Sequence, residues 1–348
     1  MGDNGWRTMP AQISLDTINA VAQALKKLYN TQQRPFSVIL HGGEPLLLGK
    51  NKLRNIVELL RDALPLDCPL GIQTNGILIT EEILDFCYKT RTTISVSLDG
   101  PQQINDSSRI GHDGKGTFDR VIKGIETLKN HRESAFLYSG LLAVVDPTSN
   151  PSEVYNFFKT LCPPSINFLH RDGNHVNLPV GKSTLTSTEY GEWFAQLLDV
   201  YLADPEPLRI KFLDDLIKLV LSDKKIEREP DLAEHGVLII DTDGSIAKND
   251  TLKSSFDGAD RFSEKWSVLT DDLNAVLCSK EFVEYHLSQQ PSSLICRKCS
   301  ELHTCAGGMA LHRWHPENGY DNPSVYCADQ KFLIKTVRDR LREIQSSL

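Results

Sequence analysis

The first apolar pattern along the chain is that of an amphipathic helix near its start. Ile18, Val21 and Leu25 recur at a spacing of three or four residues, which places them on one face of a helix. Ser14 stands just before this run, where a side-chain oxygen can cap the first turn. The pattern therefore predicts a helix over residues 14–29 with one apolar face.

After this helix, apolar runs of strand length alternate with amphipathic helices. Such alternation is typical of parallel βαβ units joined by right-handed crossovers. The chain opens with a helix, whereas barrels and wound sheets normally open with a strand, so we expect a first strand to be missing. The predicted strands cover residues 36–40, 70–74, 93–98, 136–145 and 165–169, and the predicted helices between them cover 52–64, 80–90, 118–130 and 152–161.

The alternation stops at 172–187, in a segment rich in Gly, Asn, Pro and Ser that we interpret as a long functional loop or a domain boundary. Beyond it, Asp243-Gly244 lies between apolar stretches and predicts a hairpin turn. Two helices at 188–202 and 210–221 come before this turn, and a charged helix at 330–345 closes the chain. The predicted division is a sheet domain at 1–187, bridging helices at 188–232 and a C-terminal domain at 233–348.

Composition narrows the function classes. The 348 residues hold 38 Lys and Arg against 46 Asp and Glu, a formal charge of -8, which is opposite in sign to that of a dedicated nucleic-acid binder. The chain does not open with a basic segment and an apolar run, and a stretch of about 18 apolar residues occurs nowhere. We expect a cytoplasmic protein with no nucleic-acid partner and no membrane span.

The cysteines are placed unevenly. Five of the eight lie between positions 278 and 348, too few for a disulfide framework in a chain of this length. Cys296, Cys299 and Cys305 follow a C-x2-C-x5-C spacing, with Cys327 further on. Four thiolates on loops suit tetrahedral Zn²⁺ or an iron–sulfur cluster. The spacing predicts a metal centre and leaves the metal open.

Glycines and small polar residues follow three successive predicted strands. The sequences are His41-Gly-Gly-Glu-Pro45, Gln73-Thr-Asn-Gly76 and Ser97-Leu-Asp-Gly100. Paired glycines let a backbone approach a ligand closely, and a carboxylate beside them can accept hydrogen bonds from an amine. Since parallel strands end at one edge of the sheet, where βα barrels hold their sites, we expect a ligand site there.

These motifs, taken together, resemble those of radical S-adenosylmethionine (radical SAM) enzymes that carry a SPASM domain. The resemblance covers nearly the whole chain, from the three strand ends to the cysteine spacing. The stretches Cys305-Ala-Gly-Gly and Leu311-His-Arg-Trp314 are similar to those of maturases that build cyclophanes in ribosomal peptides. The resemblance implies an α/β fold, a partial (β/α) TIM-like barrel of radical SAM type without its first strand, and a C-terminal SPASM-like iron–sulfur domain.

The resemblance also implies a binding site for S-adenosylmethionine along the strand ends. In the family, glycine backbone and a carboxylate hold the methionine amine, small polar residues line the methionine and ribose, and an arginine can meet the carboxylate with its planar fork. The matching residues are Gly42, Gly43 and Glu44 for the amine, Thr74, Asn75 and Ser97 for the pocket, and Arg109 for the carboxylate.

The C-terminal cysteines match the ligands of one auxiliary 4Fe–4S cluster in the family. They match its second auxiliary cluster, whereas Asn249 and Met309 stand where the first auxiliary cluster would need cysteines, so the first cluster is not expected. Asp250 directly follows Asn249 and stands at a position where related enzymes hold a proton acceptor near the substrate. The implied cluster ligands are Cys296, Cys299, Cys305 and Cys327.

One departure from the family is severe. The C-x3-C-x2-C motif that binds the S-adenosylmethionine-cleaving cluster is absent, and no cysteine precedes Cys68. We do not expect the printed chain to cleave the cofactor. We interpret the absence as a truncated sequence or a start codon assigned too late, with genuine loss of the cluster as the alternative.

For the intact enzyme, the resemblance implies that a radical made from S-adenosylmethionine takes a β-hydrogen from a ribosomal precursor peptide, and that the carbon radical attacks an aromatic ring. Asp250 would accept the ring proton, and a flavodoxin or ferredoxin would donate electrons. A sulfatase-maturase-like oxidation of Ser or Cys to formylglycine shares the fold and is an alternative. A non-catalytic, metal-stapled module that binds a peptide is a third hypothesis, which the missing motif favours.

Overall fold

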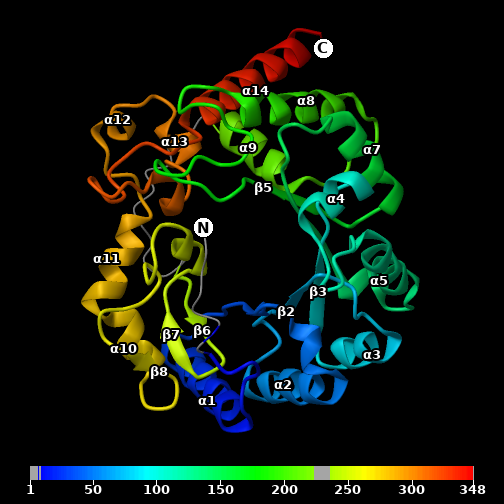
Figure 1. The fold of residues 1–348 in the computed structure, drawn as a ribbon, viewed down its shortest axis with the longest axis vertical. Coiled ribbons are helices and arrows are strands. Elements are labelled where there is room, and N and C mark those ends of the chain that lie inside the picture. The colour runs from blue at the N-terminus through cyan, green and yellow to red at the C-terminus, as the bar shows by residue number, and fades with distance from the viewer. Residues whose placement is uncertain (1–6, 8, 223–235, 348) are drawn as a thin grey trace.

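The computed structural model describes residue 7, residues 9–222 and residues 236–347. Its largest feature is a sheet of five parallel strands whose spatial order follows the chain (Figure 1). This sheet confirms the one predicted from the alternating pattern, and its strands all end at one edge. The strands are β1 (Val38–Leu40), β2 (Leu70–Thr74), β3 (Thr92–Ser97), β4 (Tyr138–Val144) and β5 (Ile166–Leu169).

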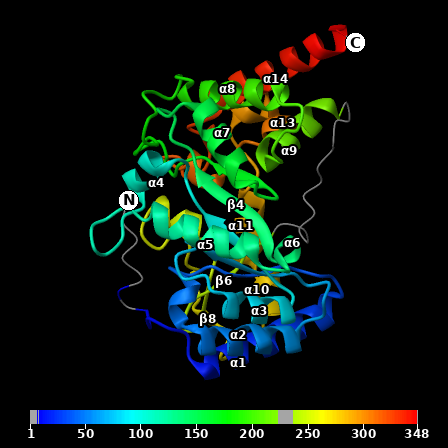
Figure 2. The ribbon, with the colours of Figure 1, turned by 90° about the vertical axis from the view of Figure 1, so that its right-hand side faces the viewer.

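Helices connect the strands and pack along the outer side of the sheet (Figure 2). Ser14, Thr80 and Asn150 cap three of them, each accepting a hydrogen bond from a backbone N–H of the first turn. Within the described ranges, no helix is both long enough and apolar enough to cross a membrane. The helical elements are α1 (Leu15–Gln32), η2 (Pro45–Leu48), α2 (Lys50–Ala63), α3 (Glu81–Lys89), α4 (Gln102–Ser108), α5 (Phe118–Asn130), α6 (Ser134–Leu137) and α7 (Pro151–Leu161).

The two faces of the sheet differ in polarity. Ile72 and Val96 point to the helix side and are fully buried. Gln73 and Ser97 alternate with them, point to the opposite face and are only half-buried. The sheet therefore presents polar side chains to the inside of the molecule, near the edge where the strands end.

The C-terminal half begins with two helices and continues with a small antiparallel sheet. The hairpin predicted at Asp243-Gly244 is confirmed, since Gly244 has a φ of 88° and donates to the carbonyl of Asp241 at 2.9 Å. The closing helix begins at Cys327, three positions before the predicted start. The elements are α8 (Glu189–Ala203), α9 (Lys211–Leu221), β6 (Ile239–Ile240), β7 (Ser245–Ala247), η3 (Asp250–Ser254), β8 (Trp266–Ser267), α10 (Leu273–Cys278), α11 (Lys280–Ser288), α12 (Leu294–Arg297), α13 (Leu302–Cys305), η4 (Ala310–Arg313) and α14 (Cys327–Ser347).

Two hydrophobic cores combine residues that are far apart in the sequence. The larger core lies between the sheet and its helices and includes Leu333 of α14. The second includes Leu25 of α1 and Leu273 of α10, and an ion pair of Lys27 with Asp272 at 2.8 Å spans the same junction. The elements consequently form a closed ring (Figure 1). The division of the chain into three parts stays a prediction, and its boundary between 232 and 233 lies outside the described residues.

Candidate functional site

Glu44 joins the ends of β1 and β2. Its carboxylate accepts hydrogen bonds from the Thr74 hydroxyl at 2.7 Å, from the Asn75 backbone N–H at 2.8 Å and from the Leu46 backbone N–H at 3.0 Å. These three donors fix the orientation of both carboxylate oxygens. The structure thus brings together three residues that the sequence proposed for one ligand site.

Gly42 and Gly43 form an open strand end beside this carboxylate. Both are exposed, and a Cβ atom added to either would meet nothing within 4 Å. Gly42 has a φ of 52°, a left-handed conformation that favours glycine, whereas Gly43 does not. Packing within the protein therefore gives no reason for glycine at position 43, and a ligand lying against the backbone gives one.

Ser97 lies on the polar inner face of the sheet. Its hydroxyl accepts a hydrogen bond from the Gln73 side chain at 2.9 Å. Gln73 belongs to the same strand-end motif as Thr74, yet the two side chains point to opposite faces of β2. Ser97 therefore lies on the strand next to Thr74 but is not hydrogen-bonded to the group formed by Glu44, Thr74 and Asn75.

Arg109 forms a two-point ion pair within the protein. Its Nε and Nη2 donate to the Asp99 carboxylate at 2.7 and 2.8 Å. Asp99 also accepts from the Val144 backbone N–H at 2.9 Å, which ties the end of β4 to the pair. The arginine fork is thus occupied by Asp99, and the assignment of Arg109 to a cofactor carboxylate stays a prediction. Sequence reasoning noted Asp99 only as part of a strand end.

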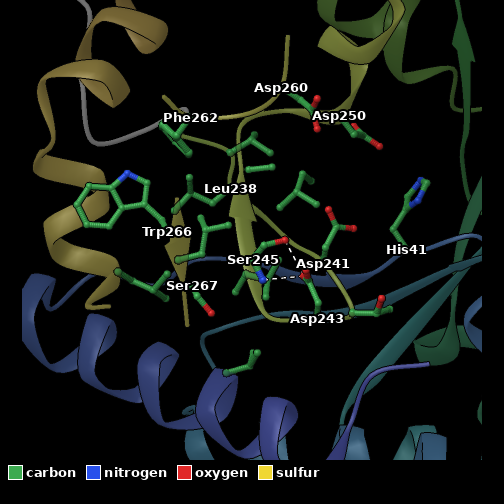
Figure 3. A pocket seen from close by; sticks show the side chains of 18 of the residues that line it. His41, Leu238, Asp241, Asp243, Ser245, Asp250, Asp260, Phe262, Trp266 and Ser267 are labelled. Carbon is green, nitrogen blue, oxygen red and sulfur yellow. Dashed lines mark hydrogen bonds between the residues drawn. The ribbon is translucent and has the colours of Figure 1, made fainter. Parts of the chain in front are cut away.

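A cavity of about 2850 Å³ lies between the end of β1 and the β6–β7 hairpin (Figure 3). Its lining includes Gly42, Gly43 and Asp250, so it joins the predicted cofactor edge to the predicted proton acceptor. Apolar side chains of α1, β1 and β6 line much of the rest. The other predicted site residues lie outside this lining.

Carboxylates gather on the hairpin side of the cavity. Asp250 begins η3, is exposed, and follows Asn249, which caps that helix. Figure 3 shows Asp241, Asp243 and Asp250 in the same cavity as His41 of the β1 end. A proton acceptor must lie where its substrate can reach it, and Asp250 is an exposed carboxylate in the lining of the cavity.

The four predicted metal-binding cysteines come from two places. Cys296 lies in α12, Cys299 lies between α12 and α13, and Cys305 ends α13. Cys327 begins α14. All four are free thiols. Cys305 donates from its Sγ to the Gln330 side chain at 2.9 Å, which brings the α13 turn against α14.

The four thiols are close enough to influence one another electrostatically. Burial raises the pKa of Cys305 to about 11, and the neighbouring thiols of Cys327, Cys296 and Cys299 raise this pKa as well. In the described residues, no three His, Cys, Asp or Glu side chains are drawn together tightly enough to hold a metal ion. The four thiols therefore form a loose group, which a metal would have to draw inward.

Comparison with known proteins identifies the family. Residues 7–161 match the model of the radical SAM superfamily. An uncharacterised protein of Methanothermobacter thermautotrophicus is 30% identical over 211 residues, covering 58% of this chain and 74% of the relative. A cysteine-type anaerobic sulfatase-maturating enzyme of Clostridium novyi is 21% identical over 348 residues, covering 95% of this chain and 88% of the relative.

Solved structures agree with this fold. Native anSMEcpe with bound AdoMet superimposes with a TM-score of 0.76 at 19% identity, covering 97% of this chain and 90% of that one. Streptococcus suis SuiB bound to precursor peptide SuiA gives 0.59 at 16% identity, covering 83% and 65%. The family consists of enzymes that use S-adenosylmethionine and 4Fe–4S clusters. The predicted fold class is confirmed, and the chain belongs to the radical SAM superfamily.

Proposed function

We propose that the protein modifies a ribosomally made precursor peptide, forming a carbon–carbon bond between an aromatic ring and a β-carbon. The supporting observation is the cavity that Gly42, Gly43 and Asp250 share. Its volume of about 2850 Å³ exceeds the roughly 300–1,000 Å³ of small-molecule pockets, so it has room for a peptide segment beside a cofactor. On this proposal, residues 1–187 hold the cofactor edge and 233–348 hold the cysteine centre.

The strand ends fit the methionine part of S-adenosylmethionine. The Glu44 carboxylate accepts from Thr74, Asn75 and Leu46, which leaves about one of its four acceptor positions for an amine. The open backbone at Gly43 leaves space for that amine. The cofactor supplies hydrogen abstraction when bound with its cluster. The printed 348 residues hold no C-x3-C-x2-C ligand set for that cluster, so we assign no step through it to this chain.

The cysteine centre fits a four-thiolate cofactor by its donor set. Cys296 is buried and Cys305 is half-buried, and burial together with neighbouring thiols raises the pKa of both, as expected for groups that need a cation to ionise. We assign them as ligands of an auxiliary 4Fe–4S cluster. Asp250, on the cavity wall, would accept the proton that the aromatic ring releases, and a flavodoxin or ferredoxin would exchange electrons.

Formation of formylglycine from Cys or Ser is the second candidate. The Clostridium novyi relative, a sulfatase-maturating enzyme, aligns over 95% of this chain, and this alignment favours the same reaction here. Both candidates place a peptide in the cavity and a hydrogen-abstracting cofactor at the strand ends. They differ in the product.

Binding of S-adenosylmethionine to the full chain, measured by anaerobic calorimetry, tests the cofactor edge. Glu44→Gln removes the negative charge from that edge, so we expect the dissociation constant to rise about tenfold, or about 1.4 kcal/mol. Glu58→Gln is the matched control, because Glu58 is exposed on α2. Equal affinities of the Glu44→Gln variant and the unaltered chain would contradict the proposed site.

The products separate the two reactions. The assay needs a version of the chain that carries a C-x3-C-x2-C motif, which the 348 residues lack. With that version and a Trp-containing peptide, we expect a mass loss of two hydrogens and a link that survives proteolysis. With a Cys-containing peptide, formylglycine would appear as an aldehyde that reacts with a hydrazide probe. Peptide binding without any 5′-deoxyadenosine would instead identify a non-catalytic binding module.

A further inference from the structure

Cys327 depends on different contacts from the other three cysteines of the candidate centre. Cys296, Cys299 and Cys305 share one short stretch around α12 and α13, whereas Cys327 is the first residue of α14. Its position is therefore set by whatever fixes the first turn of that helix.

A buried carboxylate in this first turn makes the fixing contacts. The Asp329 side chain is only 1% exposed, and it accepts from the Lys182 Nζ at 2.5 Å and from the Gly191 backbone N–H at 2.9 Å. A Cβ atom at Gly191 would lie 2.7 Å from the Asp329 carbonyl oxygen, so α8 and α14 already touch. The first turn of α14 cannot move without breaking these contacts.

Lys182 comes from the segment 170–187 that follows β5. Its side chain is fully buried, and its Nζ also donates to the Ser187 carbonyl at 2.7 Å. The same segment is held at its start by the Tyr326 hydroxyl, which donates to the Arg171 carbonyl at 2.7 Å. Tyr326 directly precedes Cys327, so the segment contacts residues on both sides of that cysteine.

This segment also reaches the candidate proton acceptor. The Asn174 side chain is fully buried and donates to the carbonyl of Ser254 at 3.0 Å, at the end of η3. The Ser254 hydroxyl in turn donates to the Asp172 carboxylate at 2.8 Å. One loop therefore holds both the helix that begins with Asp250 and the helix that begins with Cys327.

We propose that Lys182 is a positioning residue that, through Asp329, places Cys327 within reach of the other three thiols when the centre takes up metal. This inference rests on the proposed assignment of the four cysteines as ligands. Removing the lysine would leave the Asp329 carboxylate buried without a counter-charge, and the first turn of α14 would shift toward water to relieve it.

The test uses the full chain, kept anaerobic, with Co²⁺ as the probe and the thiolate charge-transfer absorption as the readout. Lys182→Met is expected to weaken Co²⁺ binding about 10- to 100-fold, the usual effect of losing an outer-shell partner. Its spectrum should match that of Cys327→Ser, which has three thiolates. Lys182→Arg keeps the cation and should bind more tightly than Lys182→Met.

Lys159→Met is the matched control. Lys159 also pairs with an aspartate, the half-buried Asp204, but Lys159 lies on α7, away from the four cysteines of the candidate centre. Its Co²⁺ affinity and spectrum should equal those of the unaltered chain. If Lys182→Met fails to fold by circular dichroism, Asp329→Asn replaces it with the same expectation, because it leaves the buried Lys182 ammonium without its paired carboxylate.

Two results would overturn the inference. One is a Lys182→Met variant that folds and binds Co²⁺ with the unaltered affinity and spectrum, while Cys327→Ser binds weakly. The other is an equal loss in Lys159→Met, which would show general loosening of the fold. If Cys327→Ser itself binds normally, the assignment of the centre fails first, and this outcome is distinguishable from both.

Discussion

At the scale of single residues, some contacts between polar side chains at the strand ends could be predicted from the sequence and others could not. Glu44, Thr74 and Asn75 follow neighbouring parallel strands, so a common edge brought them together as predicted. The partner of Arg109 was not predictable from the sequence. Asp99 is one of many carboxylates along the chain that could pair with this arginine. Only the bend from β3 into α4 selects Asp99.

Two glycine substitutions separate stability from ligand binding. Gly124→Ala in α5 would place a Cβ atom 2.0 Å from the Gly76 carbonyl oxygen, so we expect the free energy of unfolding to fall by about 1–3 kcal/mol. Gly43→Ala meets nothing within 4 Å and should change it by less than about 0.5 kcal/mol, while weakening S-adenosylmethionine binding. Urea unfolding and calorimetry measure the two effects. A large loss of stability in Gly43→Ala would show that this glycine serves the fold.

His312 makes stability depend on pH in the acid range. Burial, with a smaller contribution from the Arg313 charge, lowers the pKa of His312 to about 4. An unfolded histidine titrates near 6.5, so this contribution to stability is complete above that pH and is lost as the pH falls toward about 4. At about 1.4 kcal/mol per pKa unit, the loss reaches about 3 kcal/mol.

His312→Gln cannot take up this proton. We therefore expect its free energy of unfolding to decline less steeply than that of the unaltered chain between pH 6.5 and 4, measured by urea unfolding at each pH. His112→Gln is the control, because His112 is exposed. Parallel curves for the unaltered chain and the His312→Gln variant would rule out this explanation.

At the scale of elements, side chains at the strand ends hold neighbouring elements in register. Asp99 follows β3, pairs with Arg109 at the end of α4, and accepts from the backbone at the end of β4. One carboxylate thus joins three elements at the edge that carries the candidate site. The pattern of apolar residues predicted the elements, and only these contacts fix their relative positions.

Removing the Asp99 charge should loosen this edge. Asp99 is 8% exposed, so Asp99→Asn leaves a half-buried arginine without a carboxylate, and we expect a loss of about 2–3 kcal/mol in the free energy of unfolding. Asp113→Asn is the control, since Asp113 and Arg120 form an exposed pair at 3.8 Å and should contribute less than about 1 kcal/mol. Chemical denaturation measures the free energy of unfolding of both variants. Equal losses would contradict the proposal that Asp99 joins three elements at this edge.

At the scale of the whole molecule, the two ends of the chain depend on each other. The first helix shares a core with α10, and α14 shares another with the sheet. These contacts place the β6–β7 hairpin opposite the end of β1, and the cavity lies between them. The candidate site therefore requires both halves of the chain.

Metal removal should affect this whole arrangement. Binding at a concentration 100 times the dissociation constant adds about 2.7 kcal/mol to the free energy of unfolding, so we expect a chelator to lower the melting temperature of the loaded chain. Cys305→Ser should abolish the difference between loaded and chelated protein. Cys278→Ser is the control, because Cys278 is exposed and outside the proposed ligand set. An unaltered chain insensitive to chelation would argue against a metal centre.

The sequence by itself determined the parallel sheet, the hairpin at Asp243-Gly244, the capped helices and the residues of the strand ends, because period, caps and turn residues act locally. It also marked the four cysteines by their spacing. Only the tertiary structure decided that Asp250 and Gly43 share a cavity and that Asp99 pairs with Arg109. It also decided that Lys182 pairs with Asp329 in the first turn of α14. These pairings join residues that lie from 10 to 207 positions apart. They follow from how the ring of elements closes, which no local pattern encodes.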